Sequence, residues 1–424
     1  MLRRVEERGP RVVAAQPYGP AAAVTRRAAD RLRAGHLWVY RSDVESLVPA
    51  LGAAEIDGGV LVTVMDSRGI PLGTGLYSAA SQIAVRMVSA EVALARSVYL
   101  EEIRERVVTA LALRDEVAPE SMENDACRLV FSEADGLPGI VADRYNDLVI
   151  LQLLTQGTAQ DDVRAVLTEV VRERFNSATI IERPDPKIRE LEQLAAPSPG
   201  PLYSIGDPPQ LTSIFTINGL RFHYDAASGQ KTGAFLDQRM NYEAAARYGR
   251  GSALDVCTYQ GGFAIHLAQR CEYVTGVDAS RGALEVADRN RELNPELQAK
   301  VDWIEADAFE LLREYEASGE RYDTIVLDPP AFAKSKRAAE GAMRGYKELN
   351  LRAMKMLRPG GTLVTCSCSH HVPLAEFTEV VAAAASDSGR RVQVVEMRGA
   401  AADHPAVLTL PETSYLKCLI CRVG

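Results

Sequence analysis

The sequence predicts an α/β protein in three parts: a small β-rich domain at 1–90, a linker helix with a small central α/β domain at 91–225, and a Rossmann-like C-terminal sheet at 226–424. From about residue 226 onward, strands alternate with helices, which is typical of right-handed βαβ units and a mostly parallel sheet. Residues 24–90 instead alternate apolar and polar side chains around turn residues, as short antiparallel strands do. A length of 424 residues also exceeds what one typical hydrophobic core spans.

The composition is that of a globular protein, with 47% hydrophobic and 25% charged residues and a mean hydropathy of −0.10. No uninterrupted apolar run reaches the roughly 18 residues that a membrane-spanning helix needs. The N-terminal stretch MLRRVEERGPRVV carries charges but no apolar core, which argues against a secretory signal. Seven cysteines, an odd number spread over a long chain, do not indicate a disulfide framework. We therefore expect a cytoplasmic protein with no membrane partner.

The formal net charge of −9 is distributed unevenly. Residues 1–90 contain 11 Arg, no Lys and 8 acidic residues, a net charge of +3, which leaves −12 for the rest of the chain. Arginine suits the binding of phosphates and stacking on bases. A genome rich in G and C would also replace Lys by Arg, so the charge alone leaves RNA binding open.

Local signals predict the elements of the N-terminal half. RRAADRLRAGH at 26–36 predicts a short helix, LVTVMDSRGIPLGTGLY at 61–77 a hairpin, and 91–117 a longer helix. The cluster Asp-Gly-Leu-Pro-Gly at 135–139 predicts a tight turn between two strands, and the Pro/Gly/Ser-rich stretch 195–213 a loop.

The C-terminal part has strand signals at SALDVC, YVTGVD, VDWIEA, TIVLD, GTLVTCS, VQVVEM and YLKCLICRV. In parallel α/β sheets, ligands bind at the carboxyl ends of the strands. The candidate site residues below all lie near such strand ends.

A glycine-bearing loop follows the strand SALDVC. Gly261 and Gly262 let the backbone approach a ligand closely, and the N-terminus of the helix that begins there favours negative charge. Asp278 ends the next strand, 23 residues after Asp255, where a carboxylate can accept from both ribose hydroxyls. Asp307 follows the third strand and is placed to meet an adenine edge. The pattern predicts an adenosine-containing cofactor; it lacks the G-x-G-x-x-G of dinucleotide sites, and turn glycines of an ordinary sheet are the alternative.

The motif Asp328-Pro329-Pro330-Ala331-Phe332 ends a later strand. Its prolines stiffen the loop and remove backbone donors, so that carbonyl groups can point into a site. Phe332 is suited to stack on a base, and the Asp328 carboxylate to accept from an exocyclic amine or to exchange a ring proton. This interpretation predicts a slot for a flat nucleobase; a carboxylate that only caps the junction of strand and loop is the alternative.

The presence of a cysteine nucleophile in the site distinguishes methylation of a base carbon from methylation of a base nitrogen. Ring and exocyclic nitrogens bring their own lone pair, whereas C5 of a pyrimidine becomes nucleophilic only after a thiolate adds at C6. Cys366 and Cys368 share one strand face by their spacing, and Cys368 is nearer the carboxyl end, so we predict that Cys368 is the nucleophile. The alternative makes both thiols small core residues.

Cys418 and Cys421 form a C-x-x-C pair in the last strand. An offset of three puts them on opposite faces of a strand, and His370-His371 supplies no second pair with zinc-site spacing. We predict core cysteines and no metal site.

Several longer motifs occur in order along the chain. In the C-terminal half they are QKTGAFLDQRMN, DVCTYQGGFA, VDASRGALEVADRN, DPPAFAKSK, MRGYKELN, TCSCS and ADHPAVLTLPE followed by YLKCLICRV. In the N-terminal half they are RLRAGHLWVYRSDV, GTGLYSAASQI and SEADGLPGIVADRYNDLVILQLL. Together these motifs resemble the bacterial 23S rRNA large-subunit (cytosine-5)-methyltransferase I family, and the resemblance covers nearly the whole chain.

The resemblance implies an N-terminal PUA domain that binds RNA, a small central α/β domain, and a C-terminal class I methyltransferase domain that uses S-adenosylmethionine. It implies formation of 5-methylcytosine in 23S rRNA, with Cys368 in the position of the family's catalytic cysteine. The residues then expected to bind the cofactor are Gln238, Arg239, Thr258, Tyr259, Gln260, Gly261, Gly262, Phe263, Asp278, Ser280, Asp307, Ala308 and Asp328.

Two positions depart from the family pattern. The cofactor loop reads TYQGG at 258–262, where the family pattern is usually closer to Ser-Tyr-Thr-Gly-Gly; this change is expected to alter the affinity for the cofactor but not its identity. Cys366 stands where the family more often has an apolar residue, and it brings a second thiol near the site. In the PUA domain, Trp38 and Tyr40 are candidates for RNA contact, although we expect Trp38 to fill the core of the domain.

The leading hypothesis is an RNA cytosine-C5 methyltransferase in which Cys368 and Asp328 are catalytic and Pro329, Pro330 and Phe332 form the base slot. The second is a guanine-N7 or other base-nitrogen methyltransferase on the same scaffold, in which Cys368 is structural. The third is an RNA-binding assembly factor without catalysis. The sequence identifies neither the nucleotide, nor the stage of ribosome assembly, nor the base that removes the C5 proton, and it leaves a homodimer open.

Overall fold

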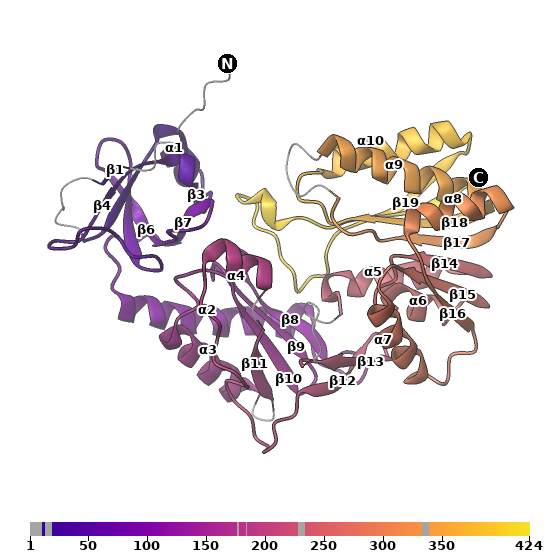
Figure 1. Ribbon diagram of the computed structural model, residues 1–424, viewed down its shortest axis with the longest axis horizontal. Helices are drawn as coiled ribbons and strands as arrows, with labels where there is room; N and C mark the ends of the chain where they lie inside the picture. Colours follow the sequence, from indigo (N-terminus) through magenta and orange to yellow (C-terminus); the bar gives the residue numbers. More distant parts are fainter. Residues whose placement is uncertain (1–10, 13–18, 176–177, 184, 228–233, 333–338) are drawn as a thin grey trace. The chain divides into compact units, whose positions relative to one another are not determined.

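The computed structural model describes residues 11–12, 19–175, 178–183, 185–227, 234–332 and 339–424 (Figure 1). Parts of two motifs, QKTG at 230–233 and AKSK at 333–336, lie outside these ranges. The chain forms two compact units: one comprises Met1–Val117, Arg128–Leu211 and Ala406–Thr413, and the other Ala118–Cys127, Thr212–Pro405 and Ser414–Gly424. Among the described residues, no helix has both the length and the apolar character needed to cross a membrane.

The first unit begins with the expected β-rich part. Its elements are β1 (Arg11–Val12), β2 (Ala21–Val24), α1 (Arg26–Arg33), β3 (Trp38–Tyr40), η1 (Arg41–Asp43), β4 (Val44–Val48), β5 (Leu61–Met65), β6 (Pro71–Tyr77) and β7 (Ile83–Ser89). The strands form one sheet in the order β1-β4-β2-β5-β6-β7-β3. The predicted hairpin is confirmed as the antiparallel pair β5–β6. Asp66 holds its turn, because the side chain accepts from the backbone N–H groups of Arg68 and Ile70.

Trp38 does not fill the core of this part, so that expectation is wrong. Successive side chains of a strand point to opposite faces, and in β3 it is Val39 that is fully buried in the core. Trp38 is half-buried on the other face, where its Nε1 donates to Glu133 Oε1 at 2.8 Å. Tyr40 lies next to it, with the rings edge to face and their centroids 6.5 Å apart.

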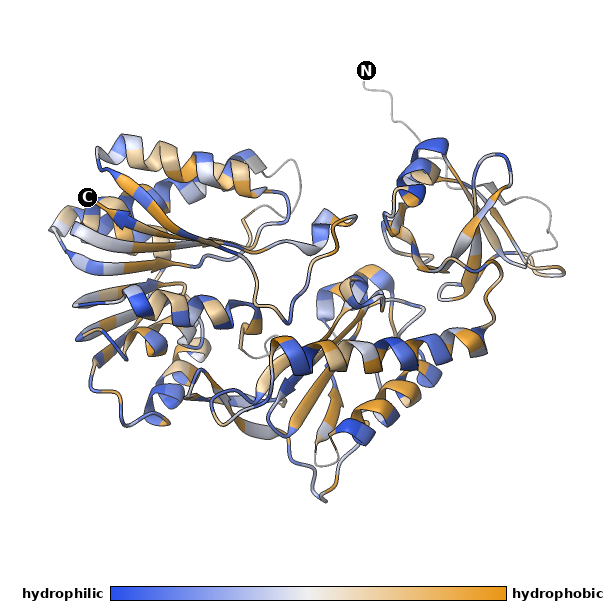
Figure 2. Cartoon of the chain, turned by 180° about the vertical axis from the view of Figure 1, so that it is seen from behind, coloured by the Kyte–Doolittle hydropathy of each residue, from blue (hydrophilic) through white to orange (hydrophobic). Residues whose placement is uncertain are grey.

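The rest of the first unit is a small α/β assembly. Its elements are α2 (Arg96–Val117), β8 (Ala126–Phe131), η2 (Ser132–Asp135), β9 (Ile140–Tyr145), β10 (Leu148–Leu153), α3 (Asp161–Arg174), β11 (Thr179–Glu182) and α4 (Pro186–Glu192). The strand order is β11-β10-β9-β8, and the apolar character of these strands is visible in Figure 2. Both guanidinium ends of the buried Arg114 donate to Asp135, at 2.6 and 2.8 Å, which ties α2 to the predicted turn after β8.

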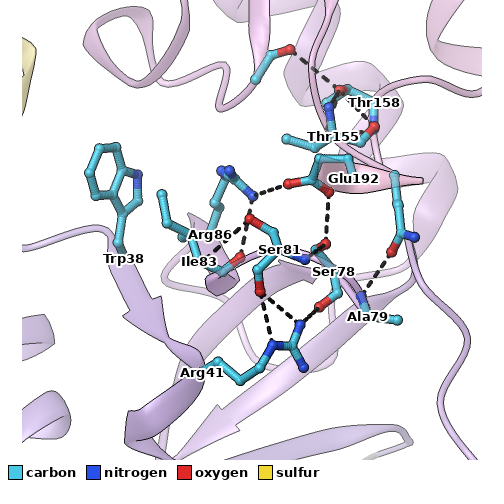
Figure 3. A network of polar contacts seen from close by, with 12 residues as sticks. Trp38, Arg41, Ser78, Ala79, Ser81, Ile83, Arg86, Thr155, Thr158 and Glu192 are labelled. Carbon is cyan, nitrogen blue, oxygen red and sulfur yellow. Dashed lines mark hydrogen bonds and ion pairs between the residues drawn. The ribbon is translucent and has the colours of Figure 1, made fainter. Parts of the chain in front are cut away.

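Glu192 connects this assembly to the β-rich part of the same unit (Figure 3). Its carboxylate is 2% exposed and accepts from Ser78 Oγ at 2.7 Å and from Arg86 Nη1 at 3.3 Å. Arg41 Nη2 in turn donates to the carbonyl oxygen of Ser78 at 2.8 Å. A buried carboxylate is tolerated only when it is paired and hydrogen-bonded, so these contacts fix the end of α4 against β6 and β7.

The second unit contains the predicted Rossmann-like sheet. Its strands are β14 (Ser252–Val256), β15 (Tyr273–Asp278), β16 (Lys300–Glu305), β17 (Tyr322–Leu327), β18 (Leu357–Ser367), β19 (Val392–Arg398) and β20 (Lys417–Val423). They follow the order β16-β15-β14-β17-β18-β20-β19, with only β20 antiparallel to its neighbours. The order reverses between β14 and β17, and such a switch point is where parallel α/β sheets bind ligands.

Helices cover both faces of this sheet (Figure 1). They are η3 (Leu236–Gln238), α5 (Arg239–Tyr248), α6 (Gly262–Leu267), α7 (Arg281–Glu292), α8 (Ala308–Ser318), α9 (Ala339–Met356) and α10 (Leu374–Ser388). Helices α8, α9 and α10 lie on one face, where Tyr346 and Phe377 pack in the core, and α5, α6 and α7 lie on the other.

A hairpin outside the sheet, β12 (Thr212–Ile217) and β13 (Leu220–Asp225), belongs to the same unit. Its turn is Asn218-Gly219, both with positive φ, 52° and 78°, as a two-residue hairpin turn requires. The Asn218 amide donates to His266 Nε2 at 3.1 Å and to the carbonyl oxygen of Arg239 at 2.9 Å. The hairpin is therefore held against α5 and α6, next to the expected cofactor loop.

Candidate active site

The loop after β14 has an unusual backbone. Cys257 and Tyr259 have φ of 65° and 52°, and Gly261 has φ of 83°. The left-handed region is unfavourable for residues with a Cβ atom, and such strain is concentrated at functional sites. The loop is held in place because the N–H of Thr258 donates to the carbonyl oxygen of Val277 at 2.9 Å.

Asp255 supports this loop from inside the sheet. Its side chain is fully buried, and Oδ2 accepts from the Thr258 hydroxyl and from the N–H of Ala264 at 2.9 Å. No hydrogen-bond partner for Oδ1 lies among the described residues. Burial raises the pKa of Asp255 to about 7. The sequence pattern marks Asp255 only as lying near the end of a strand and gives no signal for this supporting role.

Asp278 is oriented toward the loop by two backbone donors. Oδ2 accepts from the N–H of Tyr259 and Oδ1 from the N–H of Ser280, both at 2.9 Å. A carboxylate has about four lone-pair sites, so both oxygens can still accept from ribose hydroxyls. Ser280 itself caps α7, with Oγ accepting from the N–H of Ala283 at 3.3 Å.

Asp307 has a clear structural role at the exposed start of α8. Its Oδ1 accepts from the N–H groups of Phe309 and Glu310, at 2.9 and 3.1 Å, which makes it the N-cap residue. Ala308 is the first residue of the helix. Neither Asp307 nor Ala308 lines the pocket that opens over the loop after β14.

A pocket opens over the loop. It is lined by Ile217, Phe222, Ala234, Phe235, Tyr242, Cys257, Thr258, Tyr259, Gln260, Gly262, Phe263 and Asp328. Five of the expected cofactor-loop residues and Asp328 thus come together. One wall of the pocket is apolar and consists of Ile217, Phe222 and Phe235, which no sequence pattern linked to this loop. The ring of Phe235 lies 4.9 Å from that of Tyr259.

Gly262 is required by the packing under this pocket. A Cβ atom there would lie 2.5 Å from Cζ of Tyr242, which is buried and packs edge to face on Phe263 at 4.7 Å. The backbone at the start of α6 can therefore approach both Tyr242 and a ligand closely. The cradle, the apolar wall and the Asp278 carboxylate fit an adenosine-containing cofactor.

The two residues of the DQR motif point in different directions. Gln238 is buried, and its Nε2 donates to Asp328 Oδ2 at 2.9 Å, which places it at the site. Arg239 is also buried, but it donates to the carbonyl oxygen of Ala126 at 3.1 Å and forms an ion pair with Asp403 at 3.3 Å. The guanidinium of Arg239 is therefore engaged away from the pocket lining.

Asp328 is half-buried and lines the pocket. Burial, followed by the carboxylates of Asp237 and Asp255, raises the pKa of Asp328 to about 8, and the hydrogen bond from Gln238 opposes this shift. The Asp328 carboxyl group is consequently largely protonated at pH 7. A protonated carboxyl group can donate a hydrogen bond to a ring nitrogen.

The remaining residues of the predicted base slot follow Asp328 in the chain. Pro329 is buried and Pro330 exposed. Phe332 is half-buried, and its ring packs on that of Tyr346 at 4.9 Å and on that of Phe309 at 5.9 Å. Phe332 is thus fixed by aromatic neighbours on one side.

Cys368 follows β18 directly and reaches the neighbouring motif. Its Sγ lies 3.9 Å from the carbonyl oxygen of Pro329. Tyr346 holds the residues on either side, because its hydroxyl lies 2.9 Å from Ser367 Oγ and 2.9 Å from Ser369 Oγ. Burial and the carboxylates of Asp328 and Asp237 raise the pKa of the Cys368 thiol to about 11.

Cys366 lies in a different environment from Cys368. It is fully buried within β18 and pairs across the strands with Cys418. Burial and the Cys418 thiol raise the pKa of Cys366 well above its ordinary value. Cys418 and Cys421 are fully buried as well.

Comparisons with known proteins agree with this geometry. Residues 23–90 match the PUA-like domain family, and residues 190–410, more than half of the chain, match a family of S-adenosylmethionine-dependent methyltransferases. The ribosomal RNA large subunit methyltransferase I of Aliivibrio fischeri (strain MJ11) is 37% identical over 399 residues, which cover 92% of this chain and 96% of that protein. The protein of the same name from Klebsiella pneumoniae (strain 342) is 37% identical over 398 residues, covering 92% and 94%.

Solved structures share the fold. A putative S-adenosylmethionine-dependent methyltransferase from Streptococcus mutans superposes with a TM-score of 0.78 at 17% identity, over 97% of this chain and 100% of its own. The predicted fold class, with a PUA-like domain before a methyltransferase sheet, is confirmed, and so is S-adenosylmethionine as the cofactor. The chain belongs to the ribosomal RNA large subunit methyltransferase I family of S-adenosylmethionine-dependent methyltransferases.

Proposed function

We propose that this protein methylates C5 of a cytosine in 23S rRNA through a covalent adduct between Cys368 and C6 of the base. The observation that carries the proposal is the position of Cys368 beside the Asp328-Pro329 turn, 3.9 Å from the Pro329 carbonyl oxygen. The names of the relatives support a ribosomal RNA substrate. A thiol at this place has a use in methylation of carbon and none in methylation of nitrogen.

The chemistry assigns a step to each residue. The Cys368 thiolate forms a bond to C6, and the electron pair of the C5–C6 double bond moves toward N3 and C5. The Asp328 carboxyl group, protonated at neutral pH, donates its proton to N3 as charge develops there. S-adenosylmethionine, when bound, supplies the methyl group that the electron-rich C5 accepts. A base then takes the C5 proton, the sulfur–C6 bond breaks to release the Cys368 thiolate, and N3 returns its proton to the Asp328 carboxylate.

The surrounding side chains organise this site. Gln238 fixes the Asp328 carboxyl group through the 2.9 Å hydrogen bond from its amide. Tyr346 fixes the Ser367–Ser369 segment, so that the Cys368 side chain starts from a rigid backbone. We infer that Pro329, Pro330 and Phe332 form one wall for the cytosine ring, which must leave any base stack to reach the thiol.

We assign RNA capture to the PUA-like part and the chemistry to the second unit. Residues 1–90 carry a net charge of +3 against −12 elsewhere, and side chains such as Arg26 and Arg68 are 91% and 72% exposed. Exposed arginines neutralise phosphates, and their contribution falls as salt increases. A bacterial protein that modifies 23S rRNA works where ribosomes are assembled, in the cytoplasm.

The experiment uses unmodified 23S rRNA and labelled S-adenosylmethionine, with the product nucleoside identified by mass spectrometry. We expect 5-methylcytidine from the wild-type protein and none from Cys368→Ala. RNA that contains 5-fluorocytosine should trap the wild-type protein covalently, because the C5 fluorine cannot leave as a proton. A methylated purine, or full activity of Cys368→Ala, would replace the proposal by a nitrogen-directed reaction. Binding of RNA without any methyl transfer would favour an assembly factor.

A further inference from the structure

A buried lysine lies beside the segment that carries Cys368. Lys417 begins β20 and is directly opposite Ser367 in the antiparallel pair β18–β20. Only 6% of Lys417 is exposed. Lysine is almost never buried this deeply without a partner for its charge, so the position calls for an explanation.

The ammonium group is aimed at the backbone around Cys368. Nζ of Lys417 donates to the carbonyl oxygen of Ser369, the residue after Cys368, at 2.7 Å and to that of Tyr415 at 2.6 Å. An ammonium group has three donors, and within the described chain no other acceptor is bonded to this Nζ. In the same described residues no carboxylate forms an ion pair with Lys417, although the protein has 57 acidic residues.

The charges that face the Cys368 thiol come from several elements. Asp328 at the end of β17 and Asp237 in η3 disfavour the thiolate, and Lys417 on β20 favours it. Tyr346 of α9 also faces the thiol, and its hydroxyl bonds to the serines on either side. Protonation of Asp328 at neutral pH removes one of the two opposing charges. Lys417 is the one cation among the groups that act on this thiol in the described residues.

We propose that Lys417 is a positioning residue for the reaction: it holds the Ser369 carbonyl and, with its remaining N–H, stabilises the Cys368 thiolate before and after the bond to C6 exists. The inference rests on the proposed role of Cys368 as nucleophile and adds a group that stabilises the thiolate of this half-buried residue. No proton transfer from Lys417 is involved, since the ammonium acts by its charge.

Lys417 carries its positive charge only below a certain pH. Burial lowers the pKa of Lys417 to about 8, so the ammonium is present at pH 7 and is lost as the pH rises through about 8. The thiolate is therefore favoured by Lys417 only below this range. Above it, each proton lost from Lys417 weakens the stabilisation that the thiol would need.

The test is the rate of alkylation of Cys368 by iodoacetamide in the folded full-length protein, measured by mass spectrometry of the Cys368 peptide from pH 6 to 10. An opposite charge a few ångströms away shifts a pKa by roughly 1–3 units. We therefore expect Lys417→Met to slow alkylation of Cys368 at pH 7.5 by about 10-fold or more, and Lys417→Arg to restore most of the rate. Cys127 and Cys257, which are also partly accessible, are internal controls that should not change.

A second measurement needs no variant. If Lys417 stabilises the thiolate, the wild-type rate rises about tenfold per pH unit below about pH 8 and then flattens, because Lys417 loses its proton there, below the Cys368 thiol pKa of about 11, and no longer favours the thiolate. An unbroken rise through pH 8 would overturn the proposal, as would an unchanged profile in a folded Lys417→Met protein. Lys417→Gln replaces Lys417→Met if the latter does not fold.

Failure of this inference is distinguishable from failure of the proposed function. If Cys368→Ala abolishes 5-methylcytidine while Lys417→Met keeps the alkylation profile of the wild type, only the role of Lys417 is wrong. If Cys368→Ala keeps its activity, the proposed function is wrong, and the alkylation profile still shows whether the lysine acts on the thiol.

Discussion

The sulfur of Cys368 lies 3.9 Å from the carbonyl oxygen of Pro329, although 39 residues separate them in the chain. The contact exists because β17 and β18 are parallel neighbours in the sheet, so that the segments after their carboxyl ends meet. The contact places the thiol beside the Asp328-Pro329-Pro330 turn, so substitutions of these residues and of their neighbours are expected to change methyl transfer or stability.

Substitution of Cys366 should affect mainly stability, whereas substitution of Cys368 should affect mainly activity. We expect Cys366→Ala to lower the free energy of unfolding by roughly 1 kcal/mol, because it removes a buried sulfur from the sheet. Methyl transfer should survive at more than half the wild-type rate. Urea unfolding and a methylation assay check this, with Cys368→Ala as the matched opposite case. Loss of methylation in Cys366→Ala with intact folding would move the nucleophile to Cys366.

Asp328 should contribute to methyl transfer by donating its carboxyl proton. Asp328→Asn keeps the shape and can still donate a hydrogen bond, but it cannot transfer a proton, so we expect kcat to fall roughly 100-fold or more. In the wild-type protein the pKa of about 8 predicts loss of the protonated form, and of its contribution to kcat, as the pH rises above about 8. A kcat profile from pH 6 to 9.5 tests this; a variant as active as the wild type at pH 7 would remove Asp328 from the chemistry.

Asp328 should make the free energy of unfolding fall as the pH rises, whereas a carboxylate in an ion pair makes it rise. The pKa of Asp328 is raised in the folded state above its ordinary value of 3.8, so its contribution favours the folded protein at low pH and declines between about pH 4 and 8. Asp328→Asn should abolish this part of the pH dependence. The difference in unfolding free energy between the two proteins, measured at pH 5 and pH 9, gives the result.

Tyr346→Phe should loosen the segment that carries Cys368. The change removes a hydroxyl that lies 2.9 Å from both Ser367 Oγ and Ser369 Oγ, and buried hydroxyls without partners are unfavourable. We expect a loss of about 1–2 kcal/mol in unfolding free energy and a fall in kcat with little change in KM for RNA. Tyr273→Phe, at a residue 55% exposed, is the control and should change neither.

Gly262→Ala should damage the cofactor pocket. The added Cβ would lie 2.5 Å from Cζ of Tyr242, so the ring that lines the pocket must move. We expect about 1–3 kcal/mol of destabilisation and at least a tenfold weaker affinity for S-adenosylmethionine, measured by calorimetry. Gly282→Ala, in α7 where a Cβ meets nothing within 4 Å, is the control and should stabilise slightly.

His266 should make stability fall in mild acid. Burial lowers its pKa to about 4, and its Nδ1 donates to the Gly262 carbonyl oxygen at 2.7 Å, which leaves Nε2 to accept from Asn218. Because the folded pKa lies below the ordinary 6.5, the neutral ring stabilises the protein above about pH 6.5, and up to about 3 kcal/mol is lost as the pH falls toward 4. His266→Gln should show a flatter dependence in urea unfolding between pH 7 and 4.5; equal slopes would contradict the assignment.

Much of this architecture follows from local patterns. The strands of the Rossmann-like sheet are predictable because most of them are short apolar runs, and their mostly parallel order follows from the helices between them. That order alone brings Asp328 and Cys368 to one edge of the sheet. The turn at Gly261 and Gly262 is also predictable from the sequence, because close backbone packing requires glycine.

What the sequence could not predict depends on contacts between distant segments. The apolar wall from Ile217 and Phe222 sits on a hairpin outside the main sheet, so no periodicity links it to the cofactor loop. Arg239 and Gln238 are adjacent in sequence, yet only their packing sends one to Asp403 and the other to Asp328. Lys417 was hidden for the same reason, since a lysine in a strand is ordinarily expected at the surface.

The backbone passes back and forth between the two compact units, at residues 117–118, 127–128, 211–212, 405–406 and 413–414. A gene fragment that begins at residue 226 would therefore lack Ile217 and Phe222 from the pocket wall and the Ala126 carbonyl that binds Arg239. Recombination at a single crossover cannot exchange one unit and leave the other intact. The cofactor pocket of the second unit thus depends on segments from both sides of residue 226, which limits where such a protein can be divided or fused.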